Sequence, residues 1–228
     1  MTYPKPIFII LDLDHCLIRG DTVLIICTEL LPTLNLPVTS KIITNFFTRL
    51  GPLSSIIRGF LIKMRVDALK YNFLKIEASI HSIVEKYFHS ITYKTIRYSI
   101  TKILEKVSEL TSTANSLYVI VVTGTTKYIA NGVCMALNSM FKDRKNSLRK
   151  YRVVLVIATH MISKRNKTYI IDVFKHKREY LHALLNVLRR YTQEPILVID
   201  DDNILIRWLE ILRDKFNVVT VHVKRYWP

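Results

Sequence analysis

Short apolar segments alternate along this chain with stretches in which apolar residues recur every three or four positions. The apolar segments cover 7–11, 117–122, 153–158, 195–199 and 218–223, with a shorter one at 168–172. Apolar runs of this length are typical of strands that are buried on both faces of a parallel sheet. Because single helices separate most of these strands, the pattern predicts right-handed parallel crossovers. We therefore expect an α/β fold with a doubly wound, Rossmann-like parallel sheet.

Three helices are predicted among the later strands, and each should turn one apolar face to the sheet. The first begins near Lys127, the second begins near Lys177, and Asn203 is expected to cap the third. The inner faces expected from the helical period are Ile129, Val133, Ala136, Leu137 and Met140, then Leu181, Leu184, Leu185 and Leu188, then Ile204, Trp208 and Leu212.

The stretch between the first two strands has a helical pattern throughout, beginning at Asp21 as an N-cap. Breaks within it are expected at 36–37, 51–52 and 90–93. We therefore expect two domains. An α/β core would combine 1–20 with 113–228, and an all-helical cap, 21–112, would be inserted after the first strand.

The charge of the chain is strongly basic and uneven. The formal net charge is +16, and residues 124–190 hold fifteen Lys and Arg against three acids. The densest part of this excess lies at 142–152. One interpretation is a solvated surface that raises solubility. The other is a field that attracts an anion, either a small phosphate ester or a nucleic-acid backbone along the basic 142–190 segment.

The three cysteines, Cys16, Cys27 and Cys134, are scattered and form no Cys-x-x-Cys pair. This pattern is typical of a protein in the reducing interior of a cell. It indicates neither a disulfide framework nor a zinc site. The longest apolar stretch, 23–36, contains Glu29 and a proline, so no transmembrane helix and no membrane partner are expected. The N-terminus lacks a signal-peptide pattern, and we expect a cytoplasmic protein. The pattern leaves the oligomeric state open.

Two carboxylates, Asp12 and Asp14, stand where the first strand leaves the core. In open α/β sheets, ligands bind outside the carboxyl ends of the strands. Two neighbouring acids repel each other, so a fold tolerates them at a sheet edge mainly when a cation or a reaction uses them. The alternative is a capping Asp beside a solvated one.

Further polar segments follow the later strands in a fixed order. They are Thr123-Gly124 after the second strand, Lys175 to Lys177 at a helix start, and Asp200-Asp201-Asp202 after the strand at 195–199. With Asp12-x-Asp14, this order resembles the haloacid dehalogenase superfamily over nearly the whole chain. The helical insert resembles the cap of the phosphoserine-phosphatase branch.

The resemblance implies a phosphatase that hydrolyses a phosphate monoester through an aspartyl-phosphate. Asp12 would be the nucleophile, and Asp14 would protonate the leaving group and later activate water. Thr123 and the Gly124 amide would hold the phosphoryl oxygens just before a helix N-terminus.

The resemblance also implies a Mg²⁺ cofactor. Its ligands would be Asp12, the backbone carbonyl of Asp14, and Asp201, with Asp200 or Asp202 in support.

A lysine at the helix start would neutralise the charge of the phosphoryl group and of the nucleophile. Lys177 is preferred for this role, and Lys175 is the alternative.

Two departures from the family pattern bear on the substrate. His15-Cys16 replaces the usual small residue followed by Thr or Ser, and the last motif is an Asp pair in place of Gly-Asp-x-x-x-Asp. Phosphoserine is therefore not carried over as the substrate, and Asp21 has both a capping and a substrate-contacting interpretation.

Three functions compete on these grounds. The first is a phosphatase of a small phosphorylated metabolite, the second a nucleic-acid end phosphatase, and the third an inactive polyanion-binding protein of the same fold. Single-strand binders offer exposed aromatic rings for stacking. The aromatics of the basic segment are spread out, partly on predicted buried faces: Tyr151, Tyr169, Phe174 and Tyr180. This favours the small substrate.

Overall fold

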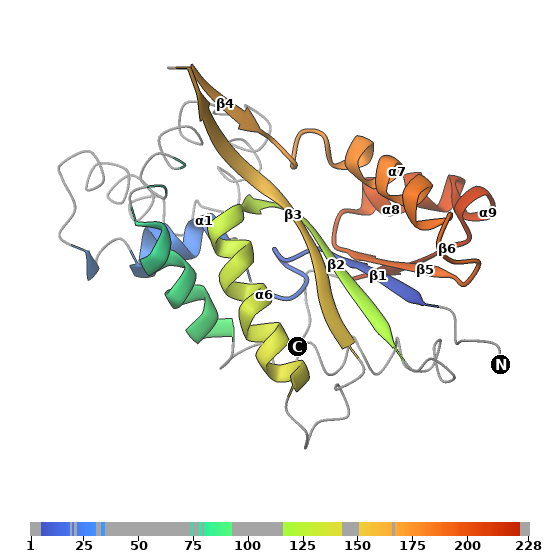
Figure 1. The fold of residues 1–228 in the computed structure, drawn as a ribbon, viewed down its shortest axis with the longest axis horizontal. Helices are drawn as coiled ribbons and strands as arrows, with labels where there is room; N and C mark the ends of the chain where they lie inside the picture. The colour runs from blue at the N-terminus through green and yellow to red at the C-terminus, as the bar shows by residue number, and fades with distance from the viewer. Residues whose placement is uncertain are drawn as a thin grey trace.

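The computed structural model of the chain describes residues 6–18, 20, 22–30, 33–34, 74, 78, 80–92, 116–142, 151–165 and 167–223. Within them, a six-stranded sheet in the order β4-β3-β2-β1-β5-β6 is flanked by helices (Figure 1). The strands are β1 (Ile7–Leu11), β2 (Leu117–Thr126), β3 (Tyr151–Lys164), β4 (Lys167–Ile171), β5 (Ile196–Asp200) and β6 (Val218–His222). The helices with defined bounds are α1 (Thr22–Ile25), the π-helix η1 (Ile26–Leu30), α6 (Lys127–Lys142), α7 (Lys177–Leu188), α8 (Asn203–Ile211) and α9 (Arg213–Phe216).

The sheet is parallel except at one edge. β1 pairs in parallel with β2 and β5, β2 with β3, and β5 with β6, whereas β4 is antiparallel to β3. The prediction of an α/β fold with a largely parallel sheet is confirmed. The short strand predicted at 168–172 also exists, but it departs from the parallel order because only residues 165–166 separate it from β3. A connection this short allows a hairpin and excludes a crossover.

Two strands are longer than predicted. β2 continues past Val122 to Thr126, and β3 continues past Ala158 to Lys164. Both extensions contain polar residues, which lie outside the apolar segments that predicted the strands. The extension of β3 is held by its pairing with β4 and not by burial, so the apolar pattern could not indicate it.

Each face of the sheet has its own apolar core. Ile9 and Leu11 face α6, whereas Ile10 lies in the cluster that includes the inner face of α7, as alternation along a strand requires. The inner faces predicted for α6 and α7 are all buried.

The predicted inner face of α8 is wrong at Ile204, whereas Trp208 and Leu212 are half-buried and pack against the core as expected. Asp202 is the N-cap, and its carboxylate accepts hydrogen bonds from the amides of Ile204 and Leu205 at 2.8 and 3.3 Å. Asn203 is therefore the first helical residue. The buried residues of α8 are Leu205, Ile206 and Leu209, and Ile204 is 67% exposed. The centre of the buried face lies at Leu205 and Leu209, one residue on from Ile204 and Trp208, which is a step of about 100° around the helix.

Most of the predicted cap, 21–112, lies outside the described residues, including Asp21 and the breaks at 36–37 and 51–52. A helix does begin at Thr22, and residues 81–92 are helical through the break expected near 90. Val84 and Phe88 of that helix belong to the same apolar cluster as α6. A Cβ on Gly132 of α6 would lie 2.3 Å from the carbonyl oxygen of Glu85, so the two helices pack closely. The two-domain division stays a prediction.

Within the described ranges, every helix is too short or too polar to cross a bilayer.

Candidate active site

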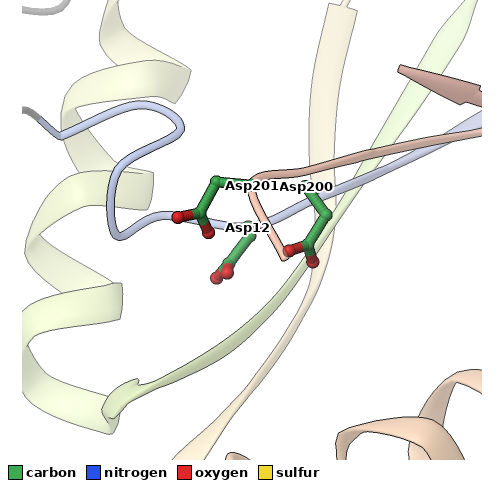
Figure 2. A group of neighbouring side chains, drawn as sticks. All are labelled: Asp12, Asp200 and Asp201. Carbon is green, nitrogen blue, oxygen red and sulfur yellow. The ribbon is translucent and has the colours of Figure 1, made fainter. Parts of the chain in front are cut away.

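Three carboxylates gather at the carboxyl ends of the two central strands. Asp12 directly follows β1, Asp200 ends β5, and Asp201 comes next in the chain. Since β1 and β5 are paired neighbours, their ends lie side by side, and the amide of Asp12 donates to the carbonyl of Ile199 at 3.1 Å. Oxygens of the three carboxylates lie within 4.8 Å of one another (Figure 2).

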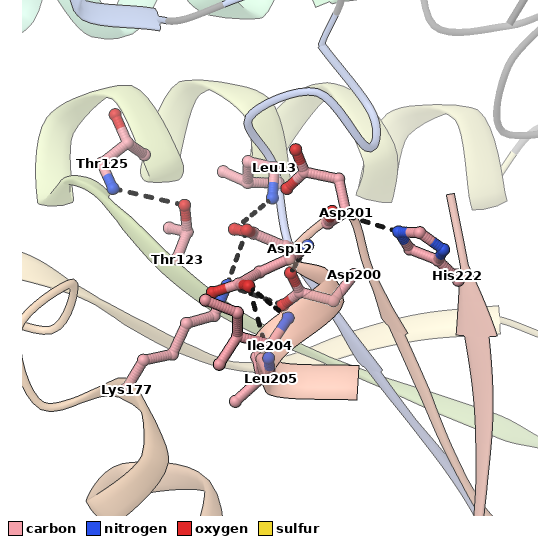
Figure 3. A network of polar contacts seen from close by, with 11 residues as sticks. Asp12, Leu13, Thr123, Thr125, Lys177, Asp200, Asp201, Ile204, Leu205 and His222 are labelled. Carbon is pink, nitrogen blue, oxygen red and sulfur yellow. Dashed lines mark hydrogen bonds and ion pairs between the residues drawn. The ribbon is translucent and has the colours of Figure 1, made fainter. Parts of the chain in front are cut away.

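A lysine from a third segment enters this acidic cluster. Nζ of Lys177, the first residue of α7, lies 2.6 Å from Oδ2 of Asp12 and 2.7 Å from Oδ2 of Asp200 (Figure 3). Asp12 and Asp200 are buried, and the side chain of Lys177 is 12% exposed. The ion pairs thus join the ends of β1 and β5 to the start of α7.

Lys175, the alternative lysine, lies elsewhere. Its side chain is exposed, and its backbone amide donates to Asp172 at 3.1 Å. Of the two candidates named from the sequence, Lys177 is the one that contacts Asp12.

Burial and the neighbouring charges have opposite effects on the pKa of Lys177. Desolvation lowers the pKa of Lys177, but the nearby Asp12 and Asp200 outweigh it, and the net effect holds that pKa well above its usual range. Lys177 therefore carries its positive charge at all ordinary pH values.

The pKa of Asp200 is also shifted, because this carboxylate is buried between an acid and a base. Burial, and next the charge of Asp12, raise the pKa of Asp200 to about 6, against the opposing effect of Lys177. One lysine thus balances two buried acids incompletely.

Backbone amides fix the remaining carboxylate oxygens. Oδ1 of Asp12 accepts from the amide of Leu13 at 2.7 Å, and Oδ1 of Asp200 accepts from the amide of Asp202 at 2.9 Å. Asp202 itself caps α8, so its carboxylate is committed there. These bonds orient the second oxygen of each acid toward Lys177 (Figure 3).

Asp14 is not one of the three clustered acids. Its Oδ1 accepts from the amide of Thr22 at 3.0 Å, which ties the turn after β1 to the start of α1. The turn is tight, because His15 has φ 60 and Leu13 accepts from the amides of 16–18. Cys16 within it is buried, and burial together with the nearby acids raises its thiol pKa, so this cysteine is neutral.

Thr123 and Gly124 lie in an irregular part of β2 and not in a loop. Thr123 pairs with Ala158 and Thr126 with the next residue of β3, so Gly124 and Thr125 form a bulge. The hydroxyl of Thr123 accepts from the amide of Thr125 at 3.3 Å, and Thr123 is fully buried. Helix α6 begins at Lys127, as predicted, so its N-terminus lies three residues after Gly124.

Two features of the site were not predicted. The hydroxyls of Thr22 and Thr125 form a buried hydrogen bond that joins α1 to the bulge of β2. Phe174 lies against the bulge, since a Cβ on Gly124 would be 2.8 Å from the Cβ of Phe174. No local sequence pattern indicates either contact, because each joins residues that are far apart in the chain.

The donor set fits a hard divalent cation. Asp12, Asp200 and Asp201 offer only carboxylate oxygens, which Mg²⁺ prefers, and their mutual repulsion would be relieved by a positive ion.

Comparisons with protein families, with curated proteins and with solved structures gave no match to this chain.

Proposed function

We propose that this protein is a Mg²⁺-dependent phosphatase of phosphate monoesters, with the chemistry implied by its resemblance to the haloacid dehalogenase superfamily. The observation that supports this most is the convergence of Asp12, Lys177 and the Asp200-Asp201 pair. Three chain segments deliver these residues to one point, with both lysine–carboxylate distances under 3 Å. The helical cap proposed for 21–112 belongs to the same hypothesis.

The reaction has two steps in this proposal. A carboxylate oxygen of Asp12 attacks phosphorus, and the bond from phosphorus to the alcohol oxygen breaks as protonated Asp14 gives that oxygen its proton. Water then attacks the phosphorus of the aspartyl-phosphate while Asp14 takes a proton from it. Inorganic phosphate leaves, and the Asp12 carboxylate is regenerated.

Lys177 would balance the charge that builds up around Asp12 during both steps. A bound Mg²⁺ would neutralise phosphoryl oxygens, with Asp12, Asp201 and Asp200 as the carboxylates that hold it.

The first test is turnover of an aryl phosphate by the full chain. EDTA should remove the activity, Mg²⁺ should restore it, and Asp12→Asn should lower kcat by about 10³-fold or more because the amide is a far weaker nucleophile. Asp214→Asn, an exposed change on α9, is the matched control and should leave turnover unchanged. Wild-type turnover in Asp12→Asn would remove the proposed nucleophile.

The sequence favoured a small phosphorylated metabolite over a nucleic-acid end, and that preference stays a prediction. It depended on the aromatic residues of the basic segment being buried or dispersed.

A further inference from the structure

The outer part of β3 and all of β4 form a hairpin, His160–Lys164 paired with Lys167–Ile171, which we call the arm. Five pairs at about 3.4 Å per residue give it a length of roughly 17 Å. In Figure 1 the arm runs outward from the sheet, on the side away from α8 and α9. Its side chains are exposed or half-buried throughout.

The tip of the arm concentrates positive charge. Lys164 and Lys167 are directly paired across the hairpin, and Arg165 follows in a left-handed conformation, φ 50. Like charges placed opposite each other destabilise a strand pair. The sequence contains no acid between Arg144 and Ile171 to offset them. A polyanion bound at the tip would be attracted by these cations and would offset their mutual repulsion.

One face of the arm carries a ring and an apolar side chain in each of its two inner pairs and two cations at its tip. Paired residues of an antiparallel hairpin point to the same face, and that face recurs every second residue. From the sheet to the tip, this face carries the pairs His160–Ile171, Ile162–Tyr169 and Lys164–Lys167. Tyr169 is 53% exposed, so its ring is open to a ligand that also contacts the tip.

The base of the arm leads directly to the candidate site. After β4, the amide of Val173 donates to the hydroxyl of Thr159 at 3.1 Å, which brings the chain back to β3. Phe174 then lies against Gly124 and is 62% exposed. Lys177, three residues on, contacts Asp12.

We propose that the arm binds single-stranded nucleic acid and that the phosphate monoester hydrolysed at Asp12 is the terminal phosphate of that strand. This rests on the proposed function and names its substrate class. The tip cations match backbone phosphates, and Tyr169 and Phe174 offer rings on which bases stack. The preference for a small substrate assumed buried or dispersed aromatics. Tyr151 is indeed buried, but Tyr169 on the arm and Phe174 against Gly124 are both exposed.

Single-stranded nucleic acid fits better than an anionic bilayer. A bilayer would match the basic tip, but it gives no reason for aromatic rings to continue from the tip down the arm toward a site for a phosphate monoester.

The test measures binding of a fluorescent 5′-phosphorylated 12-mer by anisotropy at several salt concentrations. The arm variant combines Lys164→Ser, Arg165→Asn and Lys167→Ser, in which Asn suits the left-handed position. It should bind at least tenfold more weakly at low salt. The log–log salt slope should fall by about 2, since each phosphate that the protein neutralises on a single strand contributes about 0.7 to that slope.

The matched control removes three charges elsewhere. Arg207→Gln, Arg213→Gln and Lys215→Gln lie on α8 and α9, and their side chains are exposed. Together they should leave affinity and slope nearly unchanged. An equal loss of affinity in both variants would mean that the net charge of the protein drives binding. It would contradict the proposal that the arm is the binding surface.

Tyr169 provides a test that does not depend on charge. Tyr169→Ala should weaken binding roughly 5- to 150-fold, and Tyr169→Phe should restore it, if the ring stacks on a base. Equal affinities for Tyr169→Ala and wild type would remove the stacking role. Binding of the wild type to phosphatidylserine vesicles but not to the 12-mer would overturn the nucleic-acid assignment.

Activity separates the two proposals. The arm variant should keep wild-type turnover of the aryl phosphate and lose at least tenfold in kcat/KM on the phosphorylated 12-mer. Arm-dependent binding with no turnover of either substrate would contradict the proposed phosphatase and leave the binding surface supported. Turnover of the aryl phosphate without binding of the 12-mer would contradict the binding role of the arm and leave the proposed phosphatase supported.

Discussion

The candidate site and the arm differ in how their charged side chains are arranged. At the site, the buried carboxylates of Asp12 and Asp200 lie 2.6 and 2.7 Å from the ammonium group of Lys177. At the tip of the arm, Lys164 faces Lys167 in an exposed hairpin. A largely buried cation thus lies between two acids at the site, whereas two exposed cations lie opposite each other at the tip.

The dielectric environment explains why both arrangements persist. A pair of charges in a buried site interacts several-fold more strongly than the same pair in water, so a buried acid without a partner is costly. Exposed cations are screened by water and salt, and their repulsion costs little. The acidic cluster therefore depends on Lys177 to offset part of the cost of its buried carboxylates, whereas the exposed cations of the arm are available for a ligand.

The largest expected effect comes from removing the lysine. Lys177→Met leaves Asp12 and Asp200 buried side by side without a cation, and we expect the free energy of unfolding to fall by about 3 kcal/mol at pH 7.5. Urea unfolding of the metal-free protein measures it. Lys175→Met is the matched control, because the same change two residues earlier removes only an exposed charge. Equal losses in the two variants would contradict a stabilising role for the ion pairs.

The loss in Lys177→Met should depend on pH. The raised pKa of Asp200, about 6, means that the folded state holds this proton more tightly than the unfolded state. Asp200 therefore makes folding less favourable as pH rises from about 4 through 6. Without Lys177, which lowers the pKa of Asp200, the shift should grow. The penalty should thus be small near pH 4.5 and largest above pH 7, whereas the Lys175→Met curve should follow the wild type.

Much of the fold could be predicted, because the parallel strands are continuous apolar runs and the inner faces of α6 and α7 follow a clear period. The hairpin could not be predicted in the same way. β3 beyond Ala158 and β4 are mostly exposed, and their pairing comes from backbone hydrogen bonds and a two-residue connection. The face of α8 was predicted only in part, because apolar residues occupy most positions from 204 to 212 and their spacing does not single out one face.

The charged part of the site was predicted more fully than its neutral part. Strand ends and a helix start are visible in the sequence, so Asp12, Asp200, Asp201 and Lys177 could be named before the structure was known. The bulge at Gly124 could not, because it arises from a register shift between two strands.

The contact between Gly124 and Phe174 lies between the site and the base of the arm, and it gives the next largest effect. Gly124→Ala would place a Cβ 2.8 Å from the Cβ of Phe174. We expect a loss of about 1–3 kcal/mol in the free energy of unfolding, because one of the two segments must move. Phe174→Gly removes the atoms that clash. In a double-mutant cycle by urea unfolding, Gly124→Ala should therefore cost less in the Phe174→Gly background. Strictly additive losses would show that the clash is relieved elsewhere.

The smallest effect concerns the like charges at the tip. Lys164→Glu places a carboxylate opposite Lys167 and should stabilise the hairpin by about 0.2–1 kcal/mol. Because the arm contributes little to the core, global unfolding should barely change, and the gain should appear as slower hydrogen exchange of the arm amides. Lys164→Gln removes the repulsion without adding an attraction, so it should fall between Lys164→Glu and the wild type, and the differences should shrink in 1 M salt. Faster exchange in Lys164→Glu than in the wild type would mean that the two lysines do not repel. If the three proteins rank in this order, the two lysines make the wild-type arm less stable than the Lys164→Gln and Lys164→Glu arms. Binding of a polyanion at the tip would offset this loss of stability.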